Sequence, residues 1–225
     1  MAYWPHLYLL IFIIALWALE KRFPKFMERL EENILILVIS SIMVVSFGQV
    51  IARYGFNTGW DAALEFNTVM FSWLILLGMS YGIKTGIHLG VDILLNAVPK
   101  PTRKALSIFG AGAAMLYGLI LLDSTWLAML GVEVRGGALE YWFKMYRIGL
   151  GQEELRYPTF LVEAFDMKPR VHRWLVLVVL PISLALLSYR SLQAMIDIAR
   201  DKRPMLISGH EGQDLLEENK GVLKD

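Results

Sequence analysis

The chain has 225 residues, 56% of them hydrophobic, and a mean hydropathy of +0.49. Such a chain does not resemble a soluble domain, because apolar runs of about 20 residues are what a hydrocarbon core of about 30 Å requires of a helix. The net charge of +1 gives no field that favours nucleic acid, and the absence of cysteine excludes disulfides, cysteine-ligated metal centres and thiol catalysis.

The first apolar run, Leu7–Leu19, is short and apolar on every face, unlike an amphipathic surface helix. Together with the residues from Tyr3 it reaches the minimum length for a span, so an extra N-terminal membrane helix is predicted over residues 3–19. The alternative is a re-entrant or interfacial hairpin. A cleaved signal peptide is not expected, because no basic residue precedes the run and no small-residue cleavage site follows it.

Four longer apolar segments follow, and each is long enough to cross a bilayer. They must be helices, because an open sheet would leave backbone groups unpaired in lipid. Pro181 is expected to kink the last of them. The predicted fold is an all-α integral membrane protein with one helical membrane domain over residues 1–203. Its four long transmembrane helices are predicted at residues 33–52, 66–83, 105–130 and 174–192.

Two further pieces are predicted to be interfacial arm helices. Pro24–Glu32 carries apolar residues four positions apart among charged neighbours. Val91–Val98 is short and mostly apolar, and has an acidic residue in its first turn. The tail, residues 204–225, is polar and contains glycine, so it is predicted to be disordered.

The placement of lysine and arginine predicts the orientation. Basic residues crowd before the first long span, between the second and the third, and from Arg190 onward. The connection 53–65 holds a single arginine, and the connection 131–173 mixes basic with acidic residues over a length for which this rule counts little. These two connections are therefore predicted to face outward, and the C-terminus to be cytoplasmic.

Asp123 is the only ionisable residue well inside a predicted span. An acid at membrane depth is costly, so a role in ion or proton handling is the functional hypothesis. The structural alternative is that Asp123 lies toward the outer end of its helix and bonds Ser124, Thr125 or a neighbouring helix. The sequence favours this alternative, because no second intramembrane acid and no basic partner at similar depth accompany Asp123.

Arg53 ends the first long span and Glu65 begins the second, across a short polar turn. The two residues would lie at similar depth on adjacent antiparallel helices. The sequence therefore predicts a structural clamp, either an ion pair or a hydrogen bond, that fixes the register of the helices more than it stabilises them.

The exit of the second span combines charge with glycine. Lys84, His88 and Asp92 share one face if the helix continues. Two of them could be metal ligands, but no third ligand has suitable spacing, so no metal is predicted. No membrane-enzyme signature is present either, and we expect neither catalysis nor a cofactor.

Glycines recur every fourth residue through the same stretch, a spacing that favours close contact between membrane helices. Alternatively, they mark where the helix bends onto the interface. The predicted subunit-interface residues are Trp73, Gly78, Gly82, Gly86, His88 and Asp92.

The outward connection 131–173 is rich in aromatic residues, which indicates either anchoring at the membrane interface or a dock for an outside protein. These residues are Tyr141, Trp142, Phe143, Tyr146, Tyr157, Phe160 and Phe165.

The order of these pieces resembles one family. The chain reads LEEN where the first long span opens, QVIARYGFN where it closes, and FSWLILLGMSYGIKTGIHLGVDILLNAVP through the second span and its exit. Over most of Glu31–Ile198, this order and spacing resemble the DctQ family, the small membrane subunit of tripartite ATP-independent periplasmic (TRAP) transporters.

The resemblance implies four membrane helices in the inner membrane of a bacterium or archaeon. It implies a scaffold that fixes a large TRAP membrane subunit in the lipid and helps to receive a periplasmic solute-binding protein. The stretch VHRWLVLVVLPISLALLSYRSLQ resembles the longer members, associated with uptake of C4-dicarboxylates, which are organic acids. The segment 7–19 departs from the family's four-helix plan.

Two rival functions differ from this scaffold. A self-contained small transporter or channel would have Asp123 lining its pathway, but no inverted pair of broken helices marks such a protein here. A lipid-modifying membrane enzyme would need a clustered polar site, which the sequence lacks.

Overall fold

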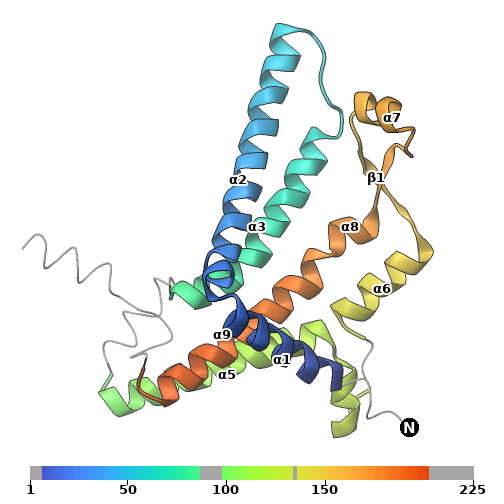
Figure 1. Ribbon diagram of the computed structural model, residues 1–225. Helices are drawn as coiled ribbons and strands as arrows, with labels where there is room; N and C mark the ends of the chain where they lie inside the picture. Colours follow the sequence, from blue (N-terminus) through green and yellow to red (C-terminus); the bar gives the residue numbers. More distant parts are fainter. Residues whose placement is uncertain (1–6, 87–97, 134–135, 203–225) are drawn as a thin grey trace, which may run out of the picture. The chain divides into compact units, whose positions relative to one another are not determined.

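The computed structural model describes residues 7–86, 98–133 and 136–202 (Figure 1). Most of these residues are helical, and four helical stretches are long and apolar enough to cross a membrane. The predicted all-α membrane fold is confirmed. The chain divides into two compact units, one within residues 1–78 and 120–185 and the other within 79–119 and 186–225.

A single residue, Phe23, separates helix α1 (Leu7–Arg22) from helix α2 (Pro24–Gly55). Pro24 begins α2, because its fixed φ suits the first helical turn and its missing N–H needs no partner there. No glycine or further proline interrupts the chain before Gly48. The arm helix expected at 24–32 is therefore the first part of α2 and continues directly into the predicted span.

The two N-terminal helices differ in length. α2 has 32 residues, or about 48 Å at the usual helical rise, which exceeds a hydrocarbon core of about 30 Å. α1 has 16 residues, or about 24 Å, and is not one of the four stretches long enough to cross. Residues 3–6 of the predicted extra span lie outside the described residues, so that span remains a prediction.

Helix α3 (Ala63–Thr85) contains the whole of the predicted second span. It runs beside α2 in Figure 1, and the Asn67 side-chain amide donates to Ser46 Oγ at 2.9 Å between the two helices. A polar pair of this kind gives both side chains a partner inside an apolar region.

Helix α5 (Lys100–Leu122) ends earlier than predicted, and a short 3-10 helix over Thr125–Leu130 follows it. The reason is Asp123, whose Oδ1 accepts from the backbone N–H of Thr125 at 2.9 Å and from its hydroxyl at 2.5 Å. An aspartate that bonds the backbone two residues later forms a turn in place of the next helical turn. The expected continuous span over 105–130 is wrong in its last eight residues.

The fourth membrane segment consists of α8 (Arg173–Leu177) and α9 (Val179–Ala199), which are interrupted at Val178. Pro181 explains the break, because it lacks the N–H that would bond Leu177 O and its ring crowds that carbonyl. The break therefore lies in the turn that precedes Pro181, where the missing N–H and the ring act on the helix.

The segment 136–172 adds structure that the sequence analysis did not anticipate. Helix α6 (Ala138–Ile148) and strand β1 (Gly151–Arg156) are followed by helix α7 (Thr159–Phe165) and strand β2 (Arg170–His172). The strands pair antiparallel with a bulge, since six residues of β1 oppose three of β2. Figure 1 shows α7 at the far end of this strand pair from α8.

Gly137 caps α6 and lies against the end of α5. A Cβ there would come within 2.6 Å of Leu122 O and 2.7 Å of Leu121 O, which are backbone atoms that cannot rotate away. We expect Gly137→Ala to destabilise the protein by about 1–3 kcal/mol, as overpacking usually does. The measurement is the thermal midpoint in detergent, followed by circular dichroism.

Gly48→Ala is the matched control, because a Cβ at Gly48 would meet nothing within 4 Å and alanine favours a helix. Equal thermal midpoints for the two variants would show that the Gly137 contact does not matter.

Candidate functional site

One tryptophan joins three elements of the first unit. The Gln49 side chain of α2 accepts from Trp60 N at 2.9 Å and donates to Trp60 O at 3.1 Å, so a single amide satisfies both backbone groups. The indole N–H of Trp60 donates to Arg156 O of β1 at 3.0 Å. Trp60 therefore ties the end of α2 and the start of α3 to the strand pair.

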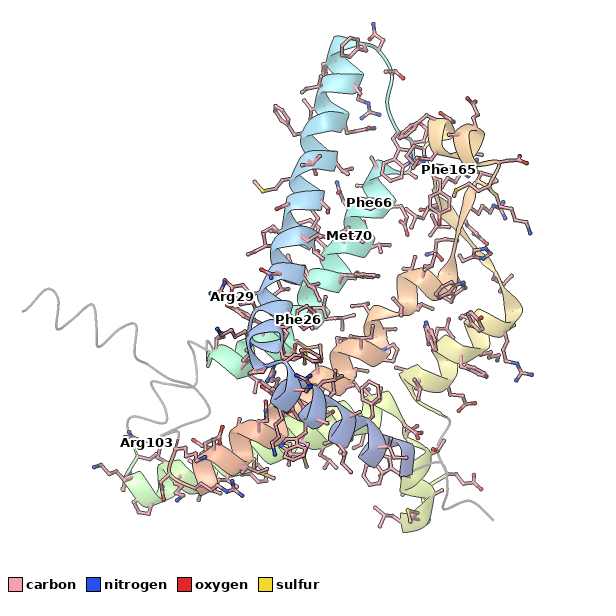
Figure 2. The ribbon with its side chains drawn as sticks, in the orientation of Figure 1. Phe26, Arg29, Phe66, Met70, Arg103 and Phe165 are labelled. Atoms are coloured by element: carbon pink, nitrogen blue, oxygen red, sulfur yellow. The ribbon has the colours of Figure 1, made fainter. Side chains whose placement is uncertain are left out.

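An apolar cluster surrounds this tryptophan. Ala62, Val69 and Leu155 are its buried members, and the Trp60 and Phe66 rings lie 5.4 Å apart. The half-buried side chains packed against the cluster are Trp60, Phe66, Met70, Trp73, Val171 and Val176, of which Phe66 and Met70 are labelled in Figure 2. We call Gln49, Trp60, Ala62, Val69 and Leu155 the Trp60 junction.

Two more indoles bond backbone carbonyls of the fourth segment. Trp73 Nε1 donates to Val176 O at 2.9 Å, next to the break between α8 and α9. Trp142 Nε1 of α6 donates to Trp174 O at 3.0 Å, and the Trp174 ring meets Tyr146 edge-on at 5.5 Å. Tryptophan N–H groups usually find a hydrogen-bond acceptor when they leave water, and here each bond also fixes a neighbouring element.

The expected clamp between Arg53 and Glu65 is absent. Both residues are described, and they form neither a hydrogen bond nor an ion pair with each other. Arg53 lies in the last turn of α2 and Glu65 in the first turn of α3, where each charge complements its own helix dipole. The neutral Gln49 amide links these helices instead, without the cost of desolvating an ion pair.

Two predicted interface residues of α3 differ in their surroundings. The Trp73 indole is engaged within the chain by its bond to Val176 O, so it serves packing. Gly78 is different, because a Cβ there would meet nothing within 4 Å in the described part of the chain. Of these two residues, Gly78 is the one that leaves room for a neighbouring molecule.

Helix α3 ends within the stretch of regularly spaced glycines. Gly86 has a φ of +78° and its N–H bonds Gly82 O at 2.8 Å, which is the left-handed helix cap that glycine adopts without strain. Helix α3 therefore ends at Thr85, just after Lys84, and the shared face predicted for Lys84, His88 and Asp92 stays a prediction. His88 and Asp92 themselves lie outside the described residues.

Asp123 is buried, with 5% of its surface exposed, and its carboxylate bonds Thr125. This is the hydrogen bond that the structural alternative expected. Within the described residues no group of three or more His, Cys, Asp or Glu side chains could hold a metal ion. The geometry gives Asp123 a role in ending α5.

Sequence reasoning missed a buried polar network in α9. Arg190 Nη1 donates to Gln193 Oε1 at 2.7 Å, and Gln193 Nε2 donates to the Tyr189 hydroxyl at 3.0 Å. Arg190 is only 4% exposed, although its charge suggested the aqueous side of the span. The sequence signal that could have predicted this network is the spacing of Tyr189, Arg190 and Gln193, because residues three or four apart in a helix can bond each other.

Comparisons with known proteins agree with this architecture. The family model of the DctQ component of tripartite ATP-independent periplasmic transporters matches residues 42–150. The C4-dicarboxylate TRAP transporter small permease protein DctQ of Vibrio cholerae is 29% identical, over 91% of this chain and 86% of its own length. Proteins with the same description from Rhodobacter capsulatus and Pseudomonas aeruginosa are 29% and 27% identical, over 61% and 62% of their own lengths. The chain is therefore similar to the DctQ-like small permease subunits of TRAP transporters, in line with the resemblance seen in its sequence.

The contacts of Trp60 predict how much stability the protein loses when this residue is replaced. Trp60→Phe keeps an aromatic ring but removes the bond to Arg156 O, and should destabilise the protein by about 1 kcal/mol. Hydrogen exchange of the β1 amides should become faster, because β1 loses its tie to the α2–α3 connection. Trp126→Phe is the matched control, since Trp126 Nε1 has no hydrogen-bond partner in the described residues. Equal exchange in both variants would contradict this role of Trp60.

Proposed function

We propose that this DctQ-like chain is a non-catalytic subunit of a TRAP system for C4-dicarboxylate uptake, in which it holds a large membrane subunit and receives a periplasmic binding protein. The relatives in three bacteria are described as C4-dicarboxylate small permease proteins, which supports the substrate class. The observation that carries the proposal is the indole-anchored segment 136–172 with its exposed aromatic tip.

The scaffold part is supported by uncovered membrane helices. In the most apolar 18-residue stretch of α2, only 11% of the residues are buried within the chain. In the corresponding stretch of Arg173–Ala199, 61% are buried. Large apolar side chains such as Met43, Val44 and Phe47 are each about two-thirds exposed on α2. These faces are available to lipid and to the helices of a large subunit.

The docking part is supported by α7. Phe160 and Phe165 are 66% and 69% exposed, and Phe165 is labelled in Figure 2. The helix lies in the connection between β1 and β2, which Tyr157 N closes by donating to Pro169 O at 2.8 Å. A short aromatic helix on an anchored hairpin is a pre-ordered contact surface, and pre-ordering lowers the entropic cost of binding.

The docking proposal predicts the effect of two substitutions. Replacing both Phe160 and Phe165 by Ser should lower transport at limiting binding-protein concentration by about tenfold, since two exposed aromatic contacts are removed. Co-purification with the large subunit should not change. The measurement is solute uptake in proteoliposomes against binding-protein concentration.

Phe143→Ser is the control, because Phe143 is also exposed but belongs to α6. An equal loss in the control, or full activity in the double variant, would reject α7 as the docking surface.

The rival function is a self-contained transporter or channel that uses Asp123. The bond of the Asp123 carboxylate to Thr125 at the end of α5 argues for a structural role of this residue.

We therefore expect no solute uptake by the purified chain alone in liposomes, and uptake when the large subunit and binding protein are added. In that complete system Asp123→Asn should keep most of the transport, because the amide oxygen still accepts from Thr125 N. Uptake by the isolated chain, or assembled Asp123→Asn complexes without coupling, would favour the rival.

A further inference from the structure

One lysine joins the start of α5 to the end of α9 in the second unit. Lys104 Nζ donates to Ala199 O at 3.2 Å and pairs with Asp201 Oδ1 at 2.7 Å. Ala199 is the last residue of α9, so the lysine supplies a partner to a carbonyl near the helix end. The first turns of α5 and the last turn of α9 therefore lie side by side.

The end of α9 has a defined geometry. Lys202 N donates to Asp197 O at 2.9 Å and Asp201 N to Ile198 O at 3.2 Å, while Asp201 has a φ of +57°. This combination is the Schellman motif, with aspartate in the left-handed position that glycine usually takes. It fixes the direction in which the chain carries Arg200 and Lys202 away from the helix.

Positive charge collects at this place, which we call the α5–α9 joint (residues 100–104 and 197–202). Its two acidic residues are outnumbered, because five side chains are basic: Lys100, Arg103, Lys104, Arg200 and Lys202. Three of these, Lys100, Arg200 and Lys202, are exposed, and their side chains make no hydrogen bond or ion pair within the described residues. An excess of three positive charges therefore faces solvent or headgroups.

We propose that the α5–α9 joint binds the phosphate headgroup of an anionic phospholipid. Both helices that meet there belong to membrane spans, and the end of a span lies at headgroup depth. Leu106 and Phe109, in the next turns of α5, are 43% and 75% exposed and offer apolar contact to an acyl chain. Basic residues beside exposed apolar ones match a lipid better than a free phosphate. This inference does not depend on the proposed transport role.

The test uses the full chain in nanodiscs and detergent. Native mass spectrometry should show preferential retention of phosphatidylglycerol over phosphatidylcholine. Replacing Lys100, Arg200 and Lys202 together by Gln should reduce that preference by about tenfold or more, since each removes an attraction to an anionic headgroup. Asp201→Asn should keep the preference, because it removes a negative charge while asparagine also tolerates the left-handed backbone.

The matched control removes the same charge elsewhere, by replacing Lys144, Lys168 and Arg170 with Gln in the segment 136–172. It should keep the lipid preference. An equal loss in this control, a wild type without preference, or displacement of the lipid by millimolar inorganic phosphate would each overturn the proposal.

Discussion

The structure depends on one constraint, which is that a polar group placed in or beside lipid must find its partner within the protein. The membrane helices satisfy this along their length. At the helix ends, individual residues supply the missing hydrogen bonds or the backbone conformation. Gly86 forms a left-handed cap, Asp123 bonds Thr125, and Lys104 bonds Ala199 O. At these three helix ends a named group supplies the hydrogen bond, and the positions of these residues set where α3, α5 and α9 stop.

Hydropathy predicted the spans well, because their length follows from the thickness of the bilayer. It could not predict their ends. The span expected to reach residue 130 stops at Leu122, since the choice between a further helical turn and a side-chain turn at Asp123 is local chemistry that an average over 20 residues conceals. Gly86 is a similar case, because glycine at four-residue spacing fits both a contact face and a helix cap.

The candidate site was harder to predict, because its contacts join residues far apart in the chain. Arg53 and Glu65 looked like partners from charge and spacing, yet the link between α2 and α3 is made by Gln49 and Trp60. Strand β1 reads GQEELR, which has little strand character, and it forms because Arg170–His172 returns beside it. The Trp60 bond to Arg156 spans 96 positions, and no local pattern encodes such a contact.

The hairpin that carries α7 also makes this part of the protein modular. The bond between Tyr157 N and Pro169 O brings the two ends of the loop together, so the loop begins and ends at nearly the same place. Residues between them can be exchanged or lengthened at a small entropic cost, without moving the helices in the membrane. A chimaera that carries a different loop between Tyr157 and Pro169 should therefore fold with the same membrane helices.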